Sequence, residues 1–197
     1  MAIPEITTFD GYEDKDRKLD ELVVITHSNG GKKYRVGAMK YCIDERCVGR
    51  KGYGIDPTDP ETAAMQFQKN AEFWGNENKN PFVQYMHTYL KETAPTAEEA
   101  MRLTNEIIGP VVKEHLAITV AHEEDHDKSL YHTHTYRDAT NFNDGSMIYS
   151  ENTTNYDMAQ RTADVIGKPV QLIVKYDYNG KEWKCPAVFV PQNNEDE

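Results

Sequence analysis

The sequence is poor in cysteine and has no long hydrophobic run. Its three cysteines, Cys42, Cys47 and Cys185, form no CxxC pair and indicate no disulfide framework, as expected in a reducing compartment. No stretch of about 18 consecutive apolar residues occurs, which excludes a membrane-spanning helix and gives no reason to expect a membrane partner. The polar and acidic first 16 residues exclude a secretory signal peptide. We therefore expect a cytoplasmic protein.

Positive charge is also scarce, with 22 Lys and Arg against 33 Asp and Glu and a formal net charge of −11. Binding of nucleic acid over the whole surface is thereby disfavoured, because phosphates are neutralised by Lys and Arg. Residues 32–51 are the exception, with seven basic side chains against Asp44 and Glu45. This segment predicts one localised anionic ligand, with an ordinary solvated surface as the alternative. Its basic residues are Lys32, Lys33, Arg35, Lys40, Arg46, Arg50 and Lys51.

The length of 197 residues fits one domain with a single core. Apolar and β-branched runs predict strands over residues 22–26, 81–90, 116–121 and 130–139, and a final hairpin over 170–190 that turns at Asn179-Gly180. Helical spacing of apolar residues predicts helices over residues 34–43, 61–74, 96–111 and 154–166, and the glycines and prolines of 51–60 predict a loop. This alternation predicts an α+β fold with an antiparallel sheet and helices packed on one face.

The third expected helix begins at a capping box, Thr96-Ala97-Glu98-Glu99. The Thr96 hydroxyl is expected to accept a hydrogen bond from the Glu99 backbone amide, while the Glu99 carboxylate reaches back to the start of the helix. Gly109-Pro110 predicts a distortion near the end of the same helix.

Histidine is concentrated in one segment, because four of the seven histidines lie between positions 122 and 134. His122 directly follows the apolar run of residues 116–121, and the alternate residues His132 and His134 project from one face of a strand. Pairing of the two strands can place His122 opposite them. Three neutral imidazoles with open coordination positions predict a catalytic site for a divalent metal.

The acidic segment between these histidines adds further candidates. Glu124 and Asp125 can hold the second ring nitrogen of a histidine ligand, and His126 can be a ligand, a proton carrier or a bystander. The alternative is that the histidines are structural and the acidic loop is solvated. The spacing leaves the identity of the metal open, zinc included.

The segment Lys40-Tyr41-Cys42-Ile43-Asp44-Glu45 resembles the first motif of conjugative relaxases of the MOBP class, in which a helix near the N-terminus carries a tyrosine. The cluster from His122 to His134 resembles their third, HUH-type motif. Gly54 to Phe67 and Thr96 to Ala100 resemble two further segments of relaxases from Gram-positive conjugative transposons and mobilisable elements. The ordered set spans roughly residues 33–167.

The chain departs from the family pattern at several positions. The loop between His122 and His132 is longer than usual, and Glu124 stands where an aspartate is expected. The segment after His134 is more polar than its usual counterpart. Gln84 occupies the position of an upstream histidine, with His87 nearby.

The resemblance implies an HUH endonuclease that nicks and religates single-stranded DNA at a transfer origin. Tyr41 would attack a phosphodiester and form a 5′-phosphotyrosine, assisted by a divalent metal, Mg²⁺ or Mn²⁺, on His122, His132 and His134. The basic residues of 32–51 would contact the DNA, and the partners would include an accessory mobilisation protein and a coupling protein. Residues 1–197 would form one relaxase domain with a relaxase-like palm, and further C-terminal domains would lie outside this chain.

Several alternatives remain at this level. Tyr34, Tyr53 or a histidine can replace Tyr41 as the nucleophile. The metal site can also serve a phosphoesterase that uses water, or an HUH replication-initiator nuclease whose tyrosine is Tyr156. A module that binds nucleic acid or protein and holds a structural metal is the alternative without enzymatic activity.

Overall fold

The computed structural model describes residues 7–8, 21–27, 32–123, 130–148, 152–178, 181–184 and 187–192. Within these residues the chain forms four helices, α1 (Lys32–Cys42), α2 (Pro60–Phe73), α3 (Ala97–Val112) and α4 (Asn152–Ile166). The same residues form nine strands, β1 (Thr7–Thr8), β2 (Glu21–His27), β3 (Cys47–Tyr53), β4 (Phe82–Leu90), β5 (His115–Glu123), β6 (Leu130–Asn141), β7 (Val170–Tyr178), β8 (Lys181–Lys184) and β9 (Ala187–Phe189).

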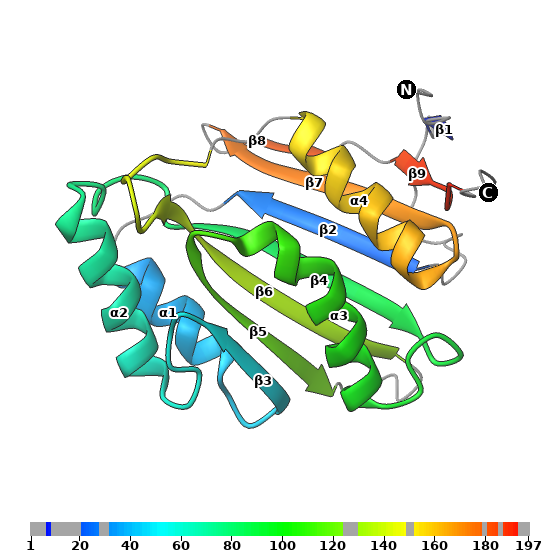
Figure 1. Cartoon of the computed structure of the whole chain (residues 1–197), viewed down its shortest axis with the longest axis horizontal. Coiled ribbons are helices and arrows are strands. Elements are labelled where there is room, and N and C mark those ends of the chain that lie inside the picture. The colour runs from blue at the N-terminus through cyan, green and yellow to red at the C-terminus, as the bar shows by residue number, and fades with distance from the viewer. Residues whose placement is uncertain are drawn as a thin grey trace.

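All the strands belong to one sheet, in the order β1-β9-β7-β2-β4-β6-β5-β3, with β8 paired to β7 (Figure 1). The predicted α+β fold is confirmed. The sheet is mixed, however, because β2 and β7 run parallel while the other pairs are antiparallel. The physical reason is the connection through α4, which brings the chain back to the sheet in the direction of β2.

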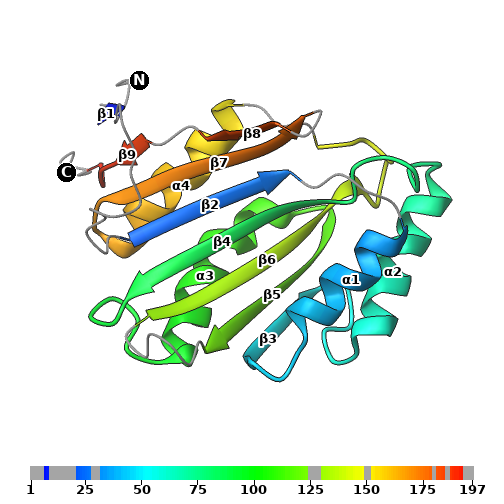
Figure 2. The same ribbon diagram turned by 180° about the vertical axis from the view of Figure 1, so that it is seen from behind.

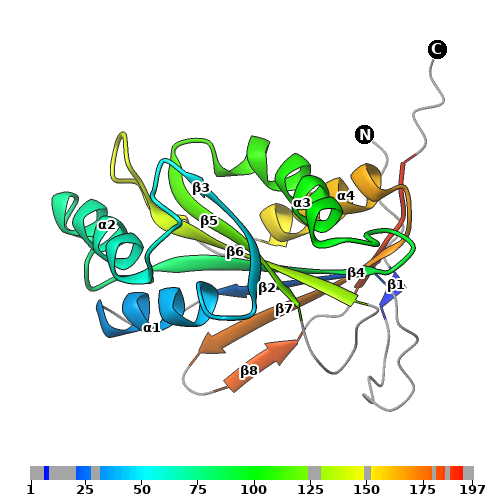
Figure 3. The same ribbon diagram turned by 90° about the horizontal axis from the view of Figure 1, so that it is seen from below.

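Helices cover both faces of the sheet, so the expectation of helices on one face was wrong. Helices α3 and α4 lie on one side, and α1 lies on the other with α2 beside it (Figures 2 and 3). Separate hydrophobic clusters lie on the two faces, because alternate residues of each strand point to opposite sides. Val23, Ala117 and Ile107 belong to the core under α3 and α4, whereas Ile118 and Val120 pack with Met39 and its neighbours from α1 and α2. The continuous apolar run of β5 reflects burial on both faces.

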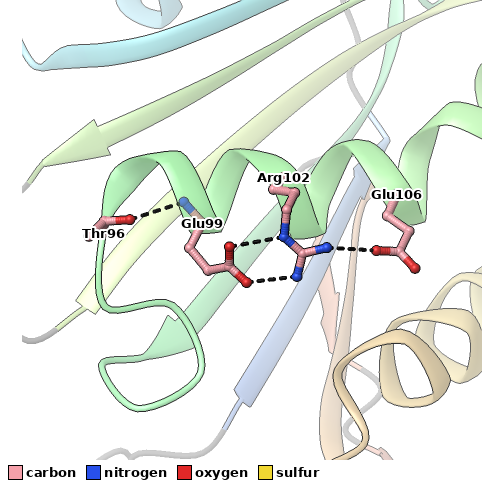
Figure 4. Close-up of polar contacts among 4 residues, drawn as sticks. All are labelled: Thr96, Glu99, Arg102 and Glu106. Carbon is pink, nitrogen blue, oxygen red and sulfur yellow. Dashed lines mark hydrogen bonds and ion pairs between the residues drawn. The ribbon is translucent and has the colours of Figure 1, made fainter.

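The capping box of α3 is confirmed in its first half. The Thr96 hydroxyl accepts from the Glu99 backbone amide at 3.1 Å (Figure 4). The Glu99 carboxylate does not reach back, because it turns along the helix to accept from Arg102 at 2.9 and 2.7 Å. A guanidinium one turn away is the stronger donor, since it carries a charge. Helix α3 contains Pro110 and ends at Val112, one residue beyond the expected bound.

The other expected elements occur close to their predicted bounds, but strands β1 and β3 were not predicted. β3 occupies residues 47–53, so the predicted loop begins later than expected. Its sequence, CVGRKGY, shows no regular alternation of apolar and polar residues, because β3 is an edge strand and is half exposed. The hairpin prediction over 170–190 corresponds to β7, β8 and β9, and its turn at Asn179-Gly180 lies outside the described residues. Among the described helices, none combines the length and apolarity that crossing a membrane requires.

Candidate active site

Three of the predicted histidines lie on the same face of the sheet. His122 of β5 stands directly opposite His132 of β6, and His134 follows two residues further along β6. Directly opposed residues of antiparallel strands project to the same side, as do alternate residues of one strand. The side chains therefore share the face that α1 covers. The rings of His122 and His134 lie close together, with centroids 4.8 Å apart.

His122 is fixed by the end of α1. Its side chain is 0% exposed, and its Nε2 donates to the Cys42 backbone carbonyl at 2.9 Å. Because a carbonyl oxygen can only accept, Nε2 carries the proton and Nδ1 of the neutral ring carries a lone pair. Nδ1 is buried and has no hydrogen-bond partner among the described atoms. A buried lone pair of this kind is suited to bind a cation.

The other two histidines are held differently. His132 Nδ1 forms a hydrogen bond of 2.9 Å with the hydroxyl of Thr88, its neighbour on β4. The pKa of His134 is lowered to about 3, first by burial and then by His122, His132 and the charge of Arg46. His134 is therefore a neutral imidazole at physiological pH, the form that binds metals.

These histidines do not form a ready-made metal centre. Within the ranges that the structure describes, no three His, Cys, Asp or Glu side chains are arranged so that they could hold a metal ion. The donor types and the shared face still fit a divalent cation, as does the unpartnered Nδ1 of His122. The other predicted participants, Glu124, Asp125 and His126, lie outside the described residues.

Tyr41 lies beside two of the histidines. It occupies the last turn of α1, is 47% exposed, and presents its ring with centroids 5.8 Å from His122 and 6.1 Å from His134. In both contacts the Tyr41 ring is nearly perpendicular to the imidazole, an edge-to-face arrangement that is favourable for aromatic rings. A phenol in this position can reach a substrate from solvent and remain next to a cation held by the imidazoles.

The other candidate tyrosines occupy different surroundings. The Tyr53 hydroxyl donates to the Asn105 side chain of α3 at 2.8 Å, on the face opposite the histidines. Tyr156 packs on Phe189 in the core under α3 and α4. Tyr34 lies on α1, where it contacts the Phe82 ring and the Gln84 amide.

Arg46 lies over the face of Tyr41, with its guanidinium carbon 4.6 Å from the ring centroid. Two guanidinium N–H groups donate to Oδ2 of Asp44 at 2.9 and 2.7 Å, while Oδ1 of Asp44 accepts the Arg46 backbone N–H at 2.9 Å. Hydrogen bonding to Asp44, and then to Tyr41, raises the pKa of Arg46. The same hydrogen bonds from Arg46 lower the pKa of Asp44. The sequence indicated only that Arg46 is basic, and the Asp44-x-Arg46 spacing was the available signal for this pair.

A shallow recess opens on the sheet next to Tyr41 and His134. Its volume is about 180 Å³. The strands β2, β4 and β6 form its floor, since residues of all three strands line it together with Tyr41. The lining includes Thr26, Gln84, Met86 and Tyr136. Apolar, aromatic and amide groups in one recess can take a flat base by stacking and hydrogen bonding.

The predicted basic segment is divided between surface and interior. Lys33, Lys40, Arg50 and Lys51 are exposed, and the Lys32 side chain lies outside the described set. Arg35 is only 1% exposed and donates to the Gln68 side chain at 3.0 Å and to the Glu77 carbonyl at 3.2 Å. A DNA phosphate has no access to it there, so we leave Arg35 out of the DNA contacts.

Arg35 instead lies near a buried carboxyl of β6. Burial raises the pKa of Asp138 to about 6, and the hydrogen bonds from Thr140 and Asn70 and the charge of Arg35 oppose this shift. The family pattern of an apolar strand after the histidines is therefore replaced by a buried polar network, which accounts for the polarity of residues 135–138.

A family model described as Relaxase, MobA/VirD2-like, nuclease domain, matches residues 41–172. The match begins at Tyr41, contains all three histidines and covers more than half of the chain. The chain belongs to this relaxase family. The relaxase has no match among curated proteins or solved structures. Its family consists of DNA-nicking nucleases that act on single-stranded DNA at a transfer origin and generally depend on a metal.

Proposed function

We propose that this relaxase nicks and rejoins one DNA strand at a specific transfer origin through a covalent link to Tyr41. The observation that carries the proposal is the contact of the half-exposed Tyr41 ring with both His122 and His134. A free phenol ionises with a pKa of about 10 and attacks slowly, so it needs a cationic environment. Two features supply this environment: the guanidinium of Arg46, and the histidine face of the sheet, which carries His122, His132 and His134 and is proposed to bind a cation.

In the proposed reaction the Tyr41 oxygen attacks the scissile phosphorus. The bond between phosphorus and the 3′ oxygen breaks, and the 3′ oxygen takes up a proton from solvent in place of the one that the phenol loses. The products are a 5′-phosphotyrosine and a free 3′-hydroxyl. Because one phosphodiester replaces another, attack by a 3′-hydroxyl reverses the step without a nucleotide cofactor.

We further propose that His122, His132 and His134 hold a divalent metal, Mg²⁺ or Mn²⁺. Such a cation supplies charge that polarises the scissile phosphate. His134 supports this role because its imidazole is neutral, and His122 because its Nδ1 lone pair is buried and unpartnered. Glu124, Asp125 and His126 stay candidates for additional ligands or for groups that orient the ligands.

The DNA strand is proposed to run along the exposed basic side chains Lys33, Lys40 and Arg50, with Lys32 and Lys51 as further candidates. The recess beside Tyr41 would receive a base next to the cleaved bond. Membership of the Gram-positive MOBP group, a single domain over residues 1–197, an accessory mobilisation protein and a coupling protein remain part of this proposal.

The decisive experiment asks whether Tyr41 becomes linked to DNA. The protein is incubated with Mn²⁺ and labelled single-stranded oligonucleotides that tile the transfer origin of its genetic element, and denaturing gels detect the adduct. We expect an adduct with the wild type and none with Tyr41→Phe. Tyr34→Phe, Tyr53→Phe and Tyr156→Phe are the matched controls and should retain it.

Two results would overturn the proposal. Cleavage that persists in Tyr41→Phe would identify a phosphoesterase that uses water. An adduct lost only in Tyr156→Phe would identify a replication-initiator mechanism.

A further inference from the structure

We infer that Arg46 is a catalytic residue of the relaxase, and that its guanidinium stabilises the negative charge on the Tyr41 oxygen and the attacked phosphate during nicking and rejoining. This inference rests on the proposed function and assigns Arg46 a role beyond DNA binding. It begins from the position of the guanidinium 4.6 Å over the Tyr41 ring, beside the half-exposed phenol.

The short segment after α1 holds Arg46 in this position. Asp44 accepts three N–H groups of Arg46, two from the guanidinium and one from the backbone. The Arg46 carbonyl accepts from the Glu123 backbone amide at 3.2 Å, which ties the segment to the end of β5 next to His122. Side chain and backbone are thus both fixed relative to the histidine face, so little reorganisation is needed when charge develops.

Arg46 also differs from the other basic residues of the segment. Lys40 pairs with the exposed Glu61 at 3.5 Å, and Arg50 donates to the Pro57 and Thr58 carbonyls at 3.5 and 3.1 Å. Neither contact aims at Tyr41. Asp44 uses only part of the guanidinium, whose five N–H donors leave others to meet an oxyanion. A planar donor set is suited to phosphate oxygens and to a phenolate at the same time.

Nicking and rejoining are the two directions of one reaction, in which the phosphoryl group moves between the DNA 3′ oxygen and the Tyr41 oxygen. When Tyr41 attacks, negative charge moves from its oxygen to the phosphate oxygens and then to the departing 3′ oxygen. When a 3′-hydroxyl attacks the phosphotyrosine, the Tyr41 oxygen leaves and regains negative charge. A cation fixed over the Tyr41 ring stabilises the transition state that both directions share, and it therefore accelerates nicking and rejoining by the same factor.

The test separates rate from binding. Single-turnover adduct formation and the dissociation constant for an uncleavable origin oligonucleotide are measured for Arg46→Gln, Arg46→Lys and Arg50→Gln. Arg50→Gln removes the same charge from the same segment. We expect Arg46→Gln to slow adduct formation about 100-fold, as for removal of one fixed donor at an oxyanion. Its dissociation constant should change no more than that of Arg50→Gln, and Arg46→Lys should recover part of the rate.

Asp44→Asn provides the second variant. It keeps the shape of the side chain but loosens Arg46, so we expect slower adduct formation at nearly unchanged DNA affinity. Thermal melting of each variant verifies folding, and guanidinium ion added to Arg46→Ala should raise the rate if the fold is intact. Equal losses of rate and affinity in Arg46→Gln, or a rate equal to the wild type, would refute the inference. A wild-type protein that forms no adduct would instead refute the proposed function.

Discussion

Tyr41 owes its environment to two residues that follow it closely in the chain, Cys42 and Asp44. The Cys42 carbonyl accepts from His122, and Asp44 holds Arg46 over the Tyr41 ring. One turn of helix and the residues after it therefore deliver the phenol, a histidine anchor and a cation to the same place. The segment 40–45 resembles a relaxase motif, and this arrangement gives that resemblance a physical basis.

At the same scale, the Thr88 hydroxyl orients a proposed metal ligand. It hydrogen-bonds to His132 Nδ1 at 2.9 Å, and partners of this kind commonly change metal affinity 10- to 100-fold when removed. We expect Thr88→Val to weaken Mn²⁺ binding about 10-fold, measured by calorimetry without DNA, because the ring loses the group that fixes its orientation.

Thr133→Val is the control for this measurement. Thr133 lies on β6 beside His132 but points to the other face, where its hydroxyl contacts Thr104 at 2.7 Å. Its replacement should lower stability and leave Mn²⁺ affinity unchanged. Equal affinities of Thr88→Val and wild type would show that Thr88 does not position a metal ligand.

At the scale of elements, a side chain of α4 forms hydrogen bonds with α3 in the turn before the proline of α3. Pro110 has no N–H, so the Glu106 carbonyl four residues earlier lacks its helical donor. Arg161 of α4 supplies a replacement, donating to the Glu106 carbonyl at 3.1 Å and to the Ile107 carbonyl at 2.8 Å. The end of α3 therefore stays helical because α4 completes its hydrogen bonds.

We expect Arg161→Met to lower the free energy of unfolding by about 1–2 kcal/mol, because two carbonyls lose a charged donor at a partly exposed site. Urea unfolding of Arg161→Met, Pro110→Ala and the double variant forms a cycle. In the Pro110→Ala background the Glu106 carbonyl regains a helical donor, so losing Arg161 should cost less there. A cost that is the same in both backgrounds would contradict this coupling.

The elements were predictable from the sequence to the extent that they show one period. The helical spacing of Ala100, Leu103 and Ile107 is such a signal for α3, while a continuous apolar run marks β5, and both elements occur where expected. Edge strand β3 was missed because it buries little and so alternates weakly. The parallel pairing of β2 with β7 and the placement of α1 opposite α3 depend on contacts between distant segments, which local periodicity does not contain.

The site was predictable in the same uneven way. The spacing of His132 and His134 fixed their common face, and β5–β6 pairing added His122. The choice of Tyr41 came from the family motif, since twelve tyrosines share its chemistry. Burial of Arg35 was hidden, because a basic residue in a basic segment looks like surface until the fold places it against Gln68.

For the whole molecule, an acidic relaxase must bind a polyanion through one local surface. The net charge is −11, while Lys33, Lys40 and Arg50 are exposed near Tyr41 in the chain. Binding through these few cations predicts a small number of phosphate contacts and a correspondingly shallow dependence on salt. Repulsion by the acidic remainder should restrict DNA to this surface.

Lys40→Gln, on α1 next to Tyr41, tests this expectation through the salt dependence of binding. For single strands, log K falls with log salt with a slope of about −0.7 per phosphate contacted, so loss of one contact should reduce the slope by about 0.7. Fluorescence anisotropy of an uncleavable oligonucleotide between low and moderate salt gives the slope. Lys69→Gln on α2, an exposed lysine 3.7 Å from Glu72 and outside the basic segment, should leave it unchanged. Equal changes in both variants would mean that the DNA responds to net charge and does not follow the basic segment.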